Sequence, residues 1–222
     1  MYRLLAPQIT EIPIFMQATD VSPEGLRAAV DQCVETGFEM IMMSFGDGMN
    51  MESKKTYIQS VADGVAYAHS KGIEVGGYNL MSASRHVAPG GNCLGPGGKP
   101  DGAACLASDW GDGYFATIKN FIEKTGYDTI TTDGPLFEGA ECHATNHSHH
   151  LGVLDSQWAQ YERNMDFYAW CRARGMYIHS PDPYYLRGFN KDGMGYIETN
   201  WNLPLSEQVT LARQEIYDGT WN

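Results

Sequence analysis

One short pattern recurs four times along the chain and constrains the fold more than any other feature. A stretch with helical spacing ends in polar residues and a glycine, and an apolar, strand-like segment follows at once, as in ETGFEMI, SKGIEVG, KTGYDTI and RARGMYI. Glycine ends a helix readily because it adopts the left-handed conformation. Strands that alternate with helices in this way predict a parallel sheet covered by helices, and the repeated turn favours a (β/α) barrel.

Periodicity and end signals place the individual elements. Apolar runs predict strands at 12–17, 38–45, 73–80, 127–132, 176–180 and 195–200. Amphipathic stretches predict helices at 23–36, 56–70, 108–125, 156–174 and 205–217. Three of these helices have a residue that suits an N-cap at their start: Ser22 for the first, Ser108 or Asp109 for the third and Asp155 for the fourth. The segments 81–104 and 133–154 are polar and are predicted as long loops.

This pattern predicts an α/β chain of the (β/α)8 TIM-barrel type. About six of the expected strands are found, and the final strand–helix units are missing. We therefore expect residues 1–222 to form a single, incomplete barrel domain that carries the active site.

Composition narrows the functional classes. The chain has 15 Lys and Arg against 27 Asp and Glu, a net charge of −12, and lacks the basic balance of nucleic-acid-binding or membrane-surface proteins. No apolar run reaches the roughly 18 residues of a membrane helix. The acidic composition suits a periplasmic or secreted protein, of which this chain could be a fragment, although the first residues show no signal-peptide pattern.

The cysteines and histidines leave alternatives open. Cys33 and Cys171 fall in helical patterns and are expected to be buried thiols, whereas Cys93, Cys105 and Cys142 lie in polar loops and could form one disulfide. The segment ECHATNHSHH could bind zinc, but its spacing matches no structural zinc motif, so neither a metal nor a cofactor is predicted. A polar loop beside the active site, with one histidine contacting substrate, is the favoured interpretation.

In barrels of this type the active site lies at the carboxyl ends of the strands. Polar and aromatic residues at those ends are candidates for the site: Asp47, Tyr78, Asn79, Arg85, Asp133, His179, Asp182, Tyr184, Glu198, Asn200 and Trp201.

Three of these candidates are carboxylates. Asp133 follows a β-branched run and precedes Gly-Pro, which directs it to the top of the barrel unless it serves only as a turn residue. Glu198 stands in YIETNW, whose alternate residues form a polar and aromatic face, and Asp182 is held between two prolines. Two carboxylates on either side of a glycosidic bond suffice for its hydrolysis.

The segment 108–135 (SDWGDGYFATIKNFIEKTGYDTITTDGP) resembles the nucleophile region of the α-galactosidase superfamily, glycoside hydrolase clan D. The wider chain is similar to bacterial α-galactosidase-like proteins in the phrases ETGFEM, YAHSKGIE, DSQW and GMGYIETNW.

The resemblance implies a retaining glycosidase with Asp133 as nucleophile and Glu198 as acid/base, or Asp182 if the fifth strand supplies that group. Tyr78, Tyr184 and Trp201 would then stack on a carbohydrate substrate, while Asn79, Arg85 and His179 would bond its hydroxyls. Two alternatives remain: a carbohydrate-binding barrel without catalysis, and a metal-dependent barrel hydrolase or isomerase that uses the histidine-rich loop with Asp133.

Overall fold

The computed structural model describes residues 14–43, 55–81, 87–133, 140–179, 204, 206–207 and 209–210. Within them, five parallel strands form one sheet in chain order. They are β1 (Phe15–Ala18), β2 (Met40–Met43), β3 (Glu74–Leu80), β6 (Thr129–Asp133) and β7 (Tyr177–His179). Each strand is therefore paired with its sequence neighbour in the sheet, which is the order that the repeated strand–helix pattern predicts.

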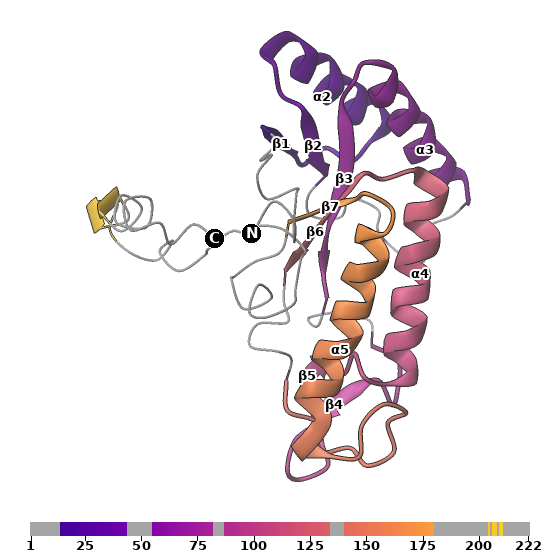
Figure 1. Ribbon diagram of the computed structural model, residues 1–222, viewed down its shortest axis with the longest axis vertical. Helices are drawn as coiled ribbons and strands as arrows, with labels where there is room; N and C mark the ends of the chain where they lie inside the picture. Colours follow the sequence, from indigo (N-terminus) through magenta and orange to yellow (C-terminus); the bar gives the residue numbers. More distant parts are fainter. Residues whose placement is uncertain are drawn as a thin grey trace.

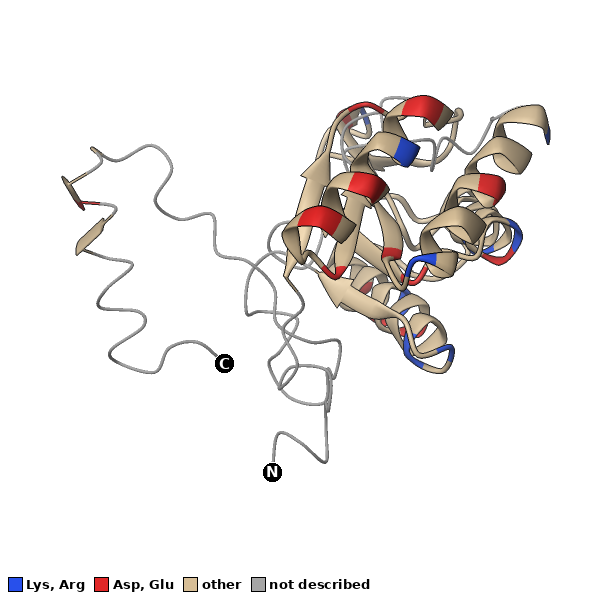
Figure 2. Ribbon diagram, turned by 90° about the horizontal axis from the view of Figure 1, so that it is seen from above, with Lys and Arg blue, Asp and Glu red and all other residues tan. Residues whose placement is uncertain are grey.

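A helix follows each of the first four strands of this sheet. These helices are α2 (Pro23–Thr36), α3 (Lys55–Ser70), α4 (Asp109–Thr125) and α5 (Val153–Arg172). Because crossovers between parallel strands are right-handed and the sheet grows in one direction, all of them fall on the same face. Figure 1 shows this helix layer beside the sheet, and Figure 2 shows acidic and basic residues along the same layer.

The end signals in the sequence are confirmed for α2 and α4. The Ser22 hydroxyl accepts a hydrogen bond from the Gly25 amide at 2.9 Å, and the Ser108 hydroxyl accepts one from the Gly111 amide. The glycines of the four repeated turns all adopt the left-handed conformation, with φ between 76° and 82°: Gly37, Gly72, Gly126 and Gly175. This conformation lets each helix turn back into the next strand within a few residues.

The prediction that 81–104 forms a long loop is wrong. This segment contains an antiparallel ribbon of β4 (Asn92–Leu94) and β5 (Pro100–Ala104). A glycine turn closes the ribbon, with the Gly95 amide donating to the Lys99 carbonyl at 2.9 Å. Such short strands in a glycine-rich stretch give no periodicity to detect.

The last helix of the layer, α5, begins earlier than predicted. It starts at Val153 rather than at 156, and Asp155 lies inside its first turn. The Asp155 carboxylate reaches back and accepts hydrogen bonds from the amides of Leu151 and Gly152 at 2.9 and 3.0 Å. It therefore caps the helix from the third position, as in a capping box, and not from the N-cap.

The remaining predicted elements fall largely outside the described residues. This applies to the strand at 195–200 and to most of the helix at 205–217, of which 206–207 and 209–210 are helical. The single-domain assignment of residues 1–222 stays a prediction. Among the described helices, none combines the length and apolar character needed to span a membrane.

The main core lies between the sheet and the helix layer. Ile41, Val75, Ile130 and Ile178, one from each of four strands, are fully buried there. They pack with apolar side chains of the helices, such as Val30, Val65, Ile118, Phe121 and Phe167. Alternate strand residues therefore face the helices, and the residues between them face the opposite side of the sheet.

The opposite face of the sheet is concave. Strands β1 and β7 are its two edges, and four strand spacings of about 4.8 Å would separate them by about 19 Å in a flat sheet. The rings of Phe15 on β1 and His179 on β7 nevertheless lie 5.2 Å apart. Across β3, the Thr131 hydroxyl lies 2.9 Å from the Met42 sulfur. The sheet is therefore curled, as in a barrel wall.

We expect Gly76→Ala to destabilise the protein, because the concave face leaves no room at this position. A Cβ at residue 76 would lie 2.0 Å from the Thr129 carbonyl oxygen and 2.2 Å from the Thr129 methyl group. Overpacking of this kind costs about 1–3 kcal/mol of unfolding free energy, or more where backbone atoms clash. Urea denaturation followed by circular dichroism measures the effect.

Gly113→Ala is the matched control for this prediction. Gly113 lies within α4, and a Cβ there meets no atom within 4 Å. Alanine should therefore stabilise the helix by about 0.5–1 kcal/mol. Equal unfolding free energies for the two variants would contradict the tight curvature at Gly76.

Candidate functional site

The carboxyl ends of the parallel strands meet at one edge of the sheet. β3 ends at Leu80 and β6 at Asp133, and these two residues are register partners. β7 ends alongside, with His179 paired to Thr131. Active sites of parallel α/β folds lie at this edge, so it is the candidate functional site.

Asp133 is the last residue of β6, between β3 and β7 in the sheet. The residue before it is anchored to the helix layer, since the hydroxyls of Thr132 and Tyr168 are 2.6 Å apart in a buried hydrogen bond. Thr129 and Thr131 belong to the concave side of the strand, because Ile130 and Thr132 face the helices. The structure thus places the backbone of Asp133 at the carboxyl edge, paired with Leu80 of β3.

His179 and Tyr78 also belong to the concave side of the sheet. His179 contacts the Phe15 ring, and burial lowers the pKa of its imidazole to about 4. Tyr78 is partly buried on β3, in register with Thr131. A neutral imidazole can both donate and accept a hydrogen bond, which suits contact with a hydroxyl-bearing ligand.

Asn79 has a different environment from its neighbour Tyr78. Its amide oxygen accepts a hydrogen bond from the hydroxyl of Tyr114 on α4. Burial raises the pKa of Tyr114, so this hydroxyl stays protonated and acts as the donor. The described contact therefore links Asn79 to the helix layer and fixes β3 against α4.

The other predicted site residues lie outside the described part of the chain: Asp47, Arg85, Asp182, Tyr184, Glu198, Asn200 and Trp201. The structure places Tyr78 and His179 in register with Thr131, two positions before the backbone of Asp133 on β6. The roles assigned to all the predicted site residues stay predictions.

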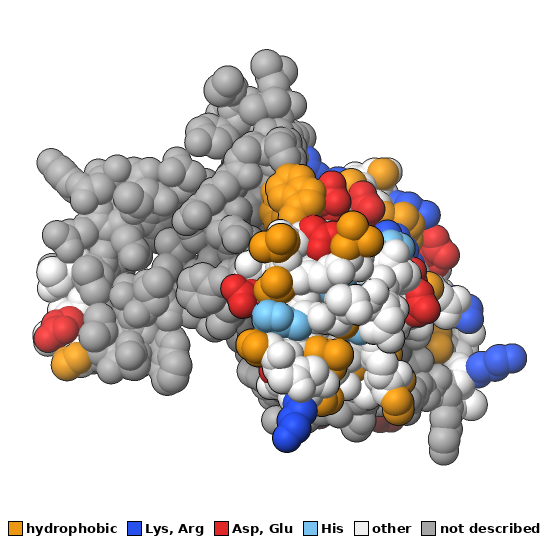
Figure 3. Space-filling view, turned by 90° about the horizontal axis from the view of Figure 1, so that it is seen from below, with side chains coloured by type: hydrophobic (Ala, Val, Ile, Leu, Met, Phe, Trp, Pro, Cys, Tyr) orange, Lys and Arg blue, Asp and Glu red, His pale blue; other side chains and the backbone are white. Residues whose placement is uncertain are grey.

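Two long connections rise from this edge and meet beside it. One follows β3 and carries the β4–β5 ribbon, and the other follows β6 and leads into α5. Figure 1 shows the ribbon at the end of the molecule where α4 and α5 begin. Figure 3 looks onto that end, where apolar side chains are interspersed with histidine and acidic groups. The most exposed apolar residues nearby are Leu151, Leu154 and Trp158.

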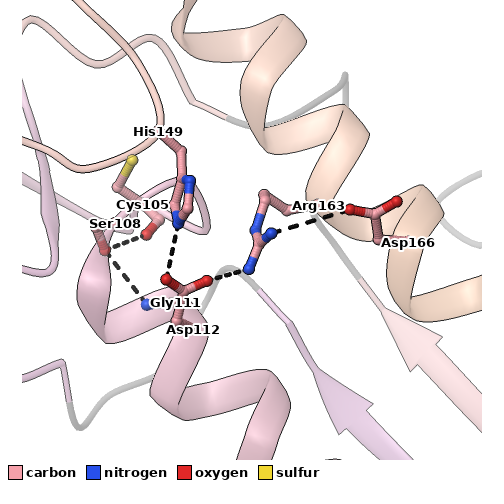
Figure 4. Close-up of polar contacts among 7 residues, drawn as sticks. All are labelled: Cys105, Ser108, Gly111, Asp112, His149, Arg163 and Asp166. Carbon is pink, nitrogen blue, oxygen red and sulfur yellow. Dashed lines mark hydrogen bonds and ion pairs between the residues drawn. The ribbon is translucent and has the colours of Figure 1, made fainter. Parts of the chain in front are cut away.

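Polar contacts of Asp112 tie both the second connection and α5 to α4. The carboxylate of Asp112, in the first turn of α4, lies 2.7 Å from the His149 Nε2 and also pairs with Arg163 of α5 (Figure 4). In the same view, the Ser108 hydroxyl donates to the Cys105 carbonyl at 2.7 Å, which fixes the chain just before α4. The two connections are thus held against the helix ends by polar contacts.

A hollow of about 440 Å³ beside these ion pairs is not the candidate active site. It is lined by His149 and by α5 residues that include Trp158, Glu162 and Asp166. No strand-end residue of the described chain lines it. It is therefore a feature of the helix layer.

The two connections also bring together a group of cysteines and histidines. The donor atoms of Cys105, Cys142, His147 and His150 all lie within 4.8 Å of one another, close enough to hold a metal ion. Sequence analysis singled out the loop that holds three of them but did not connect Cys105 with it. A thiol 37 residues before Cys142 gives no local spacing signal, so only the fold could reveal it.

All five cysteines are free thiols, so the disulfide considered among Cys93, Cys105 and Cys142 does not form. Cys33 and Cys171 are fully buried, as predicted. A hydrogen bond from Cys93 holds the pKa of Cys105 below its usual value, helped by His147 and opposed by burial. The same contact, together with burial, raises the pKa of Cys93.

Comparison with known proteins shows which solved structures have a similar fold. No protein-family model matches the sequence, and no curated protein matches it. Among solved structures, the α-galactosidase from Lactobacillus brevis superposes with a TM-score of 0.69 at 14% identity, over 91% of this chain and 31% of that chain. The GH36 α-galactosidase AgaA from Geobacillus stearothermophilus gives 0.58 at 11% identity, over 76% and 27%.

A third similar structure is the α-N-acetylgalactosaminidase NagBb from Bifidobacterium bifidum. Its TM-score is 0.55 at 15% identity, over 81% of this chain and 36% of that chain. The chain therefore spans about a third of the length of each of these glycosidases. At such identities the likeness shows the fold, and it confirms the predicted α/β architecture of the TIM-barrel type, here as part of a barrel.

We expect the His179 imidazole to stay neutral down to about pH 4, because burial opposes its charged form. An unfolded histidine titrates near pH 6.5, so the unfolded chain binds this proton more tightly than the folded protein does. Stability linked to His179 is therefore fully present above about pH 6.5 and is lost as the pH falls towards about 4. NMR titration of the imidazole carbon-bound protons measures the midpoint.

His179→Gln identifies the resonance and serves as the control. This variant should lose less unfolding free energy than the wild type between about pH 6.5 and about pH 4, since it has no proton to bind there. A wild-type midpoint near 6.5 would show that the imidazole is not held in a desolvated site.

Proposed function

We propose that this chain forms part of the catalytic barrel of a retaining glycoside hydrolase that cleaves α-galactoside-like bonds. The observation that carries the proposal is the position of Asp133, which ends the strand next to β3 at the carboxyl edge of a curled parallel sheet. The fold likeness to two α-galactosidases and an α-N-acetylgalactosaminidase supports the substrate class.

Asp133 is proposed as the nucleophile because a nucleophile must be held rigidly against the anomeric carbon. Its strand pairs with neighbours on both sides, and Thr132 is hydrogen-bonded to Tyr168 in the helix layer. The backbone at 133 is thereby held by its pairing with Leu80 and by the anchored residue before it. An aspartate that merely capped a turn would not need this support from the sheet and the helices.

The proposed reaction has two steps. The Asp133 carboxylate attacks the anomeric carbon while a second carboxylic acid protonates the leaving oxygen, and that second group then activates water to release the sugar. Glu198 is proposed for the second role and Asp182 is the alternative. A retaining mechanism requires about 5–5.5 Å between the two carboxyl groups.

The remaining strand-end residues are proposed to bind the sugar. His179 and Tyr78 lie on the concave side of the sheet, where the imidazole would bond a hydroxyl and the phenol ring would contact a sugar face. Arg85, Asp47 and Asn200 are proposed as further hydroxyl partners. Tyr184 and Trp201 are proposed to stack on the sugar.

We expect Asp133→Ala to abolish turnover of an aryl α-galactoside while the protein still folds. Loss of a catalytic nucleophile lowers kcat by about 1000-fold or more. Azide can replace the missing carboxylate, so adding it should restore release of the aryl group and yield the β-glycosyl azide. Absorbance of the released phenol and NMR of the product measure both effects.

Asp166→Asn is the matched control, because Asp166 is an exposed aspartate of α5 in the helix layer and does not belong to a strand end. It should retain wild-type kcat and unfolding temperature. Unchanged turnover in Asp133→Ala would overturn the assignment of the nucleophile. Galactose binding by the wild type without any turnover would favour a carbohydrate-binding barrel instead.

A further inference from the structure

Four metal-ligating side chains converge between the two connections at the carboxyl edge. Cys105 follows the β4–β5 ribbon, while Cys142, His147 and His150 belong to the connection between β6 and α5. The Cys105 sulfur lies 3.4 Å from the His150 Nε2, and the Cys142 sulfur lies 3.6 Å from the His147 Nδ1. The two imidazole nitrogens are 3.1 Å apart.

These separations match those between ligands around one tetrahedral zinc ion. Zinc bonds of about 2.3 Å to sulfur and about 2.0 Å to nitrogen put neighbouring S and N ligands about 3.5 Å apart, and two N ligands about 3.3 Å apart. The donor set of two thiols and two imidazoles is also one that zinc prefers. These three distances differ from the tetrahedral ones by about 0.2 Å or less, and the other pairs of donor atoms lie within 4.8 Å of each other.

The surroundings orient His150 as a ligand. Its Nδ1 lies 3.2 Å from the Gly152 carbonyl oxygen, which can only accept a hydrogen bond. The Nδ1 therefore carries the proton, which leaves the lone pair of Nε2 available to bind a metal ion. A backbone carbonyl that binds the outer nitrogen of a histidine is the usual support of a metal-bound imidazole.

The local core around this group is too small to hold the connections together by itself. Its buried members are all cysteine or alanine: Cys93, Cys105, Ala107, Cys142, Ala144 and Ala159. Such side chains bury little apolar area, so their contribution to folding is small. Small units of this kind are commonly stabilised by a disulfide or a metal, and here all the cysteines are free thiols.

We infer that Cys105, Cys142, His147 and His150 bind one structural zinc ion that joins the connections following β3 and β6. Three of the four ligands are nine-tenths or more buried, namely Cys105, Cys142 and His150. With four protein ligands the tetrahedron is closed, so no position is left for water or substrate. The ion therefore stabilises the rim of the candidate active site and takes no part in a reaction.

This inference does not depend on the proposed glycosidase activity. A metal-dependent hydrolase would need an open coordination position, which the four donors do not leave. Zinc can thus be present whether or not the protein cleaves sugars, and the two proposals can fail separately.

The first experiment measures metal bound to the full chain. Metal-free protein is titrated with zinc alone, and the zinc bound per chain is measured by inductively coupled plasma mass spectrometry. About one zinc ion per chain is expected. Cobalt substituted for zinc should give thiolate charge-transfer bands in the near ultraviolet and the visible bands of tetrahedral cobalt. Cys105→Ser and Cys142→Ser should each lower zinc content at least about tenfold and weaken those bands.

His143→Gln and Cys171→Ala are the matched controls. His143 lies in the same connection as the ligands, and Cys171 is a buried thiol of α5, but neither belongs to the donor group. Both variants should keep about one zinc per chain. If the serine variants do not fold, the wild-type titration and the cobalt spectrum still decide the question.

A thiol count separates zinc from a disulfide. Wild-type protein that has been denatured and stripped of metal should show all five thiols. A count of three, with Cys105 joined to Cys142, would overturn the inference. So would wild-type protein that binds no stoichiometric zinc, or a cobalt spectrum without thiolate bands.

Hydrogen exchange tests the structural role of the ion. Removing zinc with a chelator should speed amide exchange at least about tenfold in 91–107 and 140–152, and leave β2 and β3 unchanged, because local opening is governed by local stability. Equal exchange in the two connections with and without zinc would contradict a role in holding them together.

Discussion

The curvature of the five-stranded sheet is the constraint on which the other features depend. Phe15 and His179 belong to strands at opposite edges of the sheet. In a flat sheet these two strands would be about 19 Å apart, and their rings are in contact only because the sheet curls. Curling crowds the concave side, which explains why Gly76 faces the Thr129 backbone without room for a methyl group. It also turns the carboxyl ends of the strands towards a common centre, where Asp133 ends β6.

The helix layer maintains this curvature from outside. Each strand contributes apolar side chains to the core beneath the helices, and polar pairs fix particular strands to particular helices. Tyr114 of α4 holds Asn79, and Tyr168 of α5 holds Thr132. Successive residues of a strand point to opposite faces of the sheet. Contacts of Asn79 and Thr132 with the helices therefore also fix the backbone that carries the neighbouring residues of the concave face.

The two connections that follow β3 and β6 form the rim of the candidate site, and they are stabilised by other interactions than the sheet. Among the described residues, the buried members of the core that the two connections share are all alanine or cysteine. Directional contacts replace area burial there: the ion pairs of Asp112 with His149 and Arg163, and the four converging thiol and imidazole donors. A zinc ion bound by all four donors would give the rim a rigidity that burial of so small an apolar core cannot supply.

The sequence by itself determined the elements whose signals are local. Ser22 and Gly126 mark helix ends because capping involves residues only a few positions apart, and the repeated helix–glycine–strand turn predicted the parallel α/β sheet. Tertiary structure decided what depends on residues far apart in the chain. Cys105 approaches His150 across 45 positions, and no spacing pattern encodes that contact. The same holds for the curl that joins Phe15 to His179, since curvature is a property of the paired strands together.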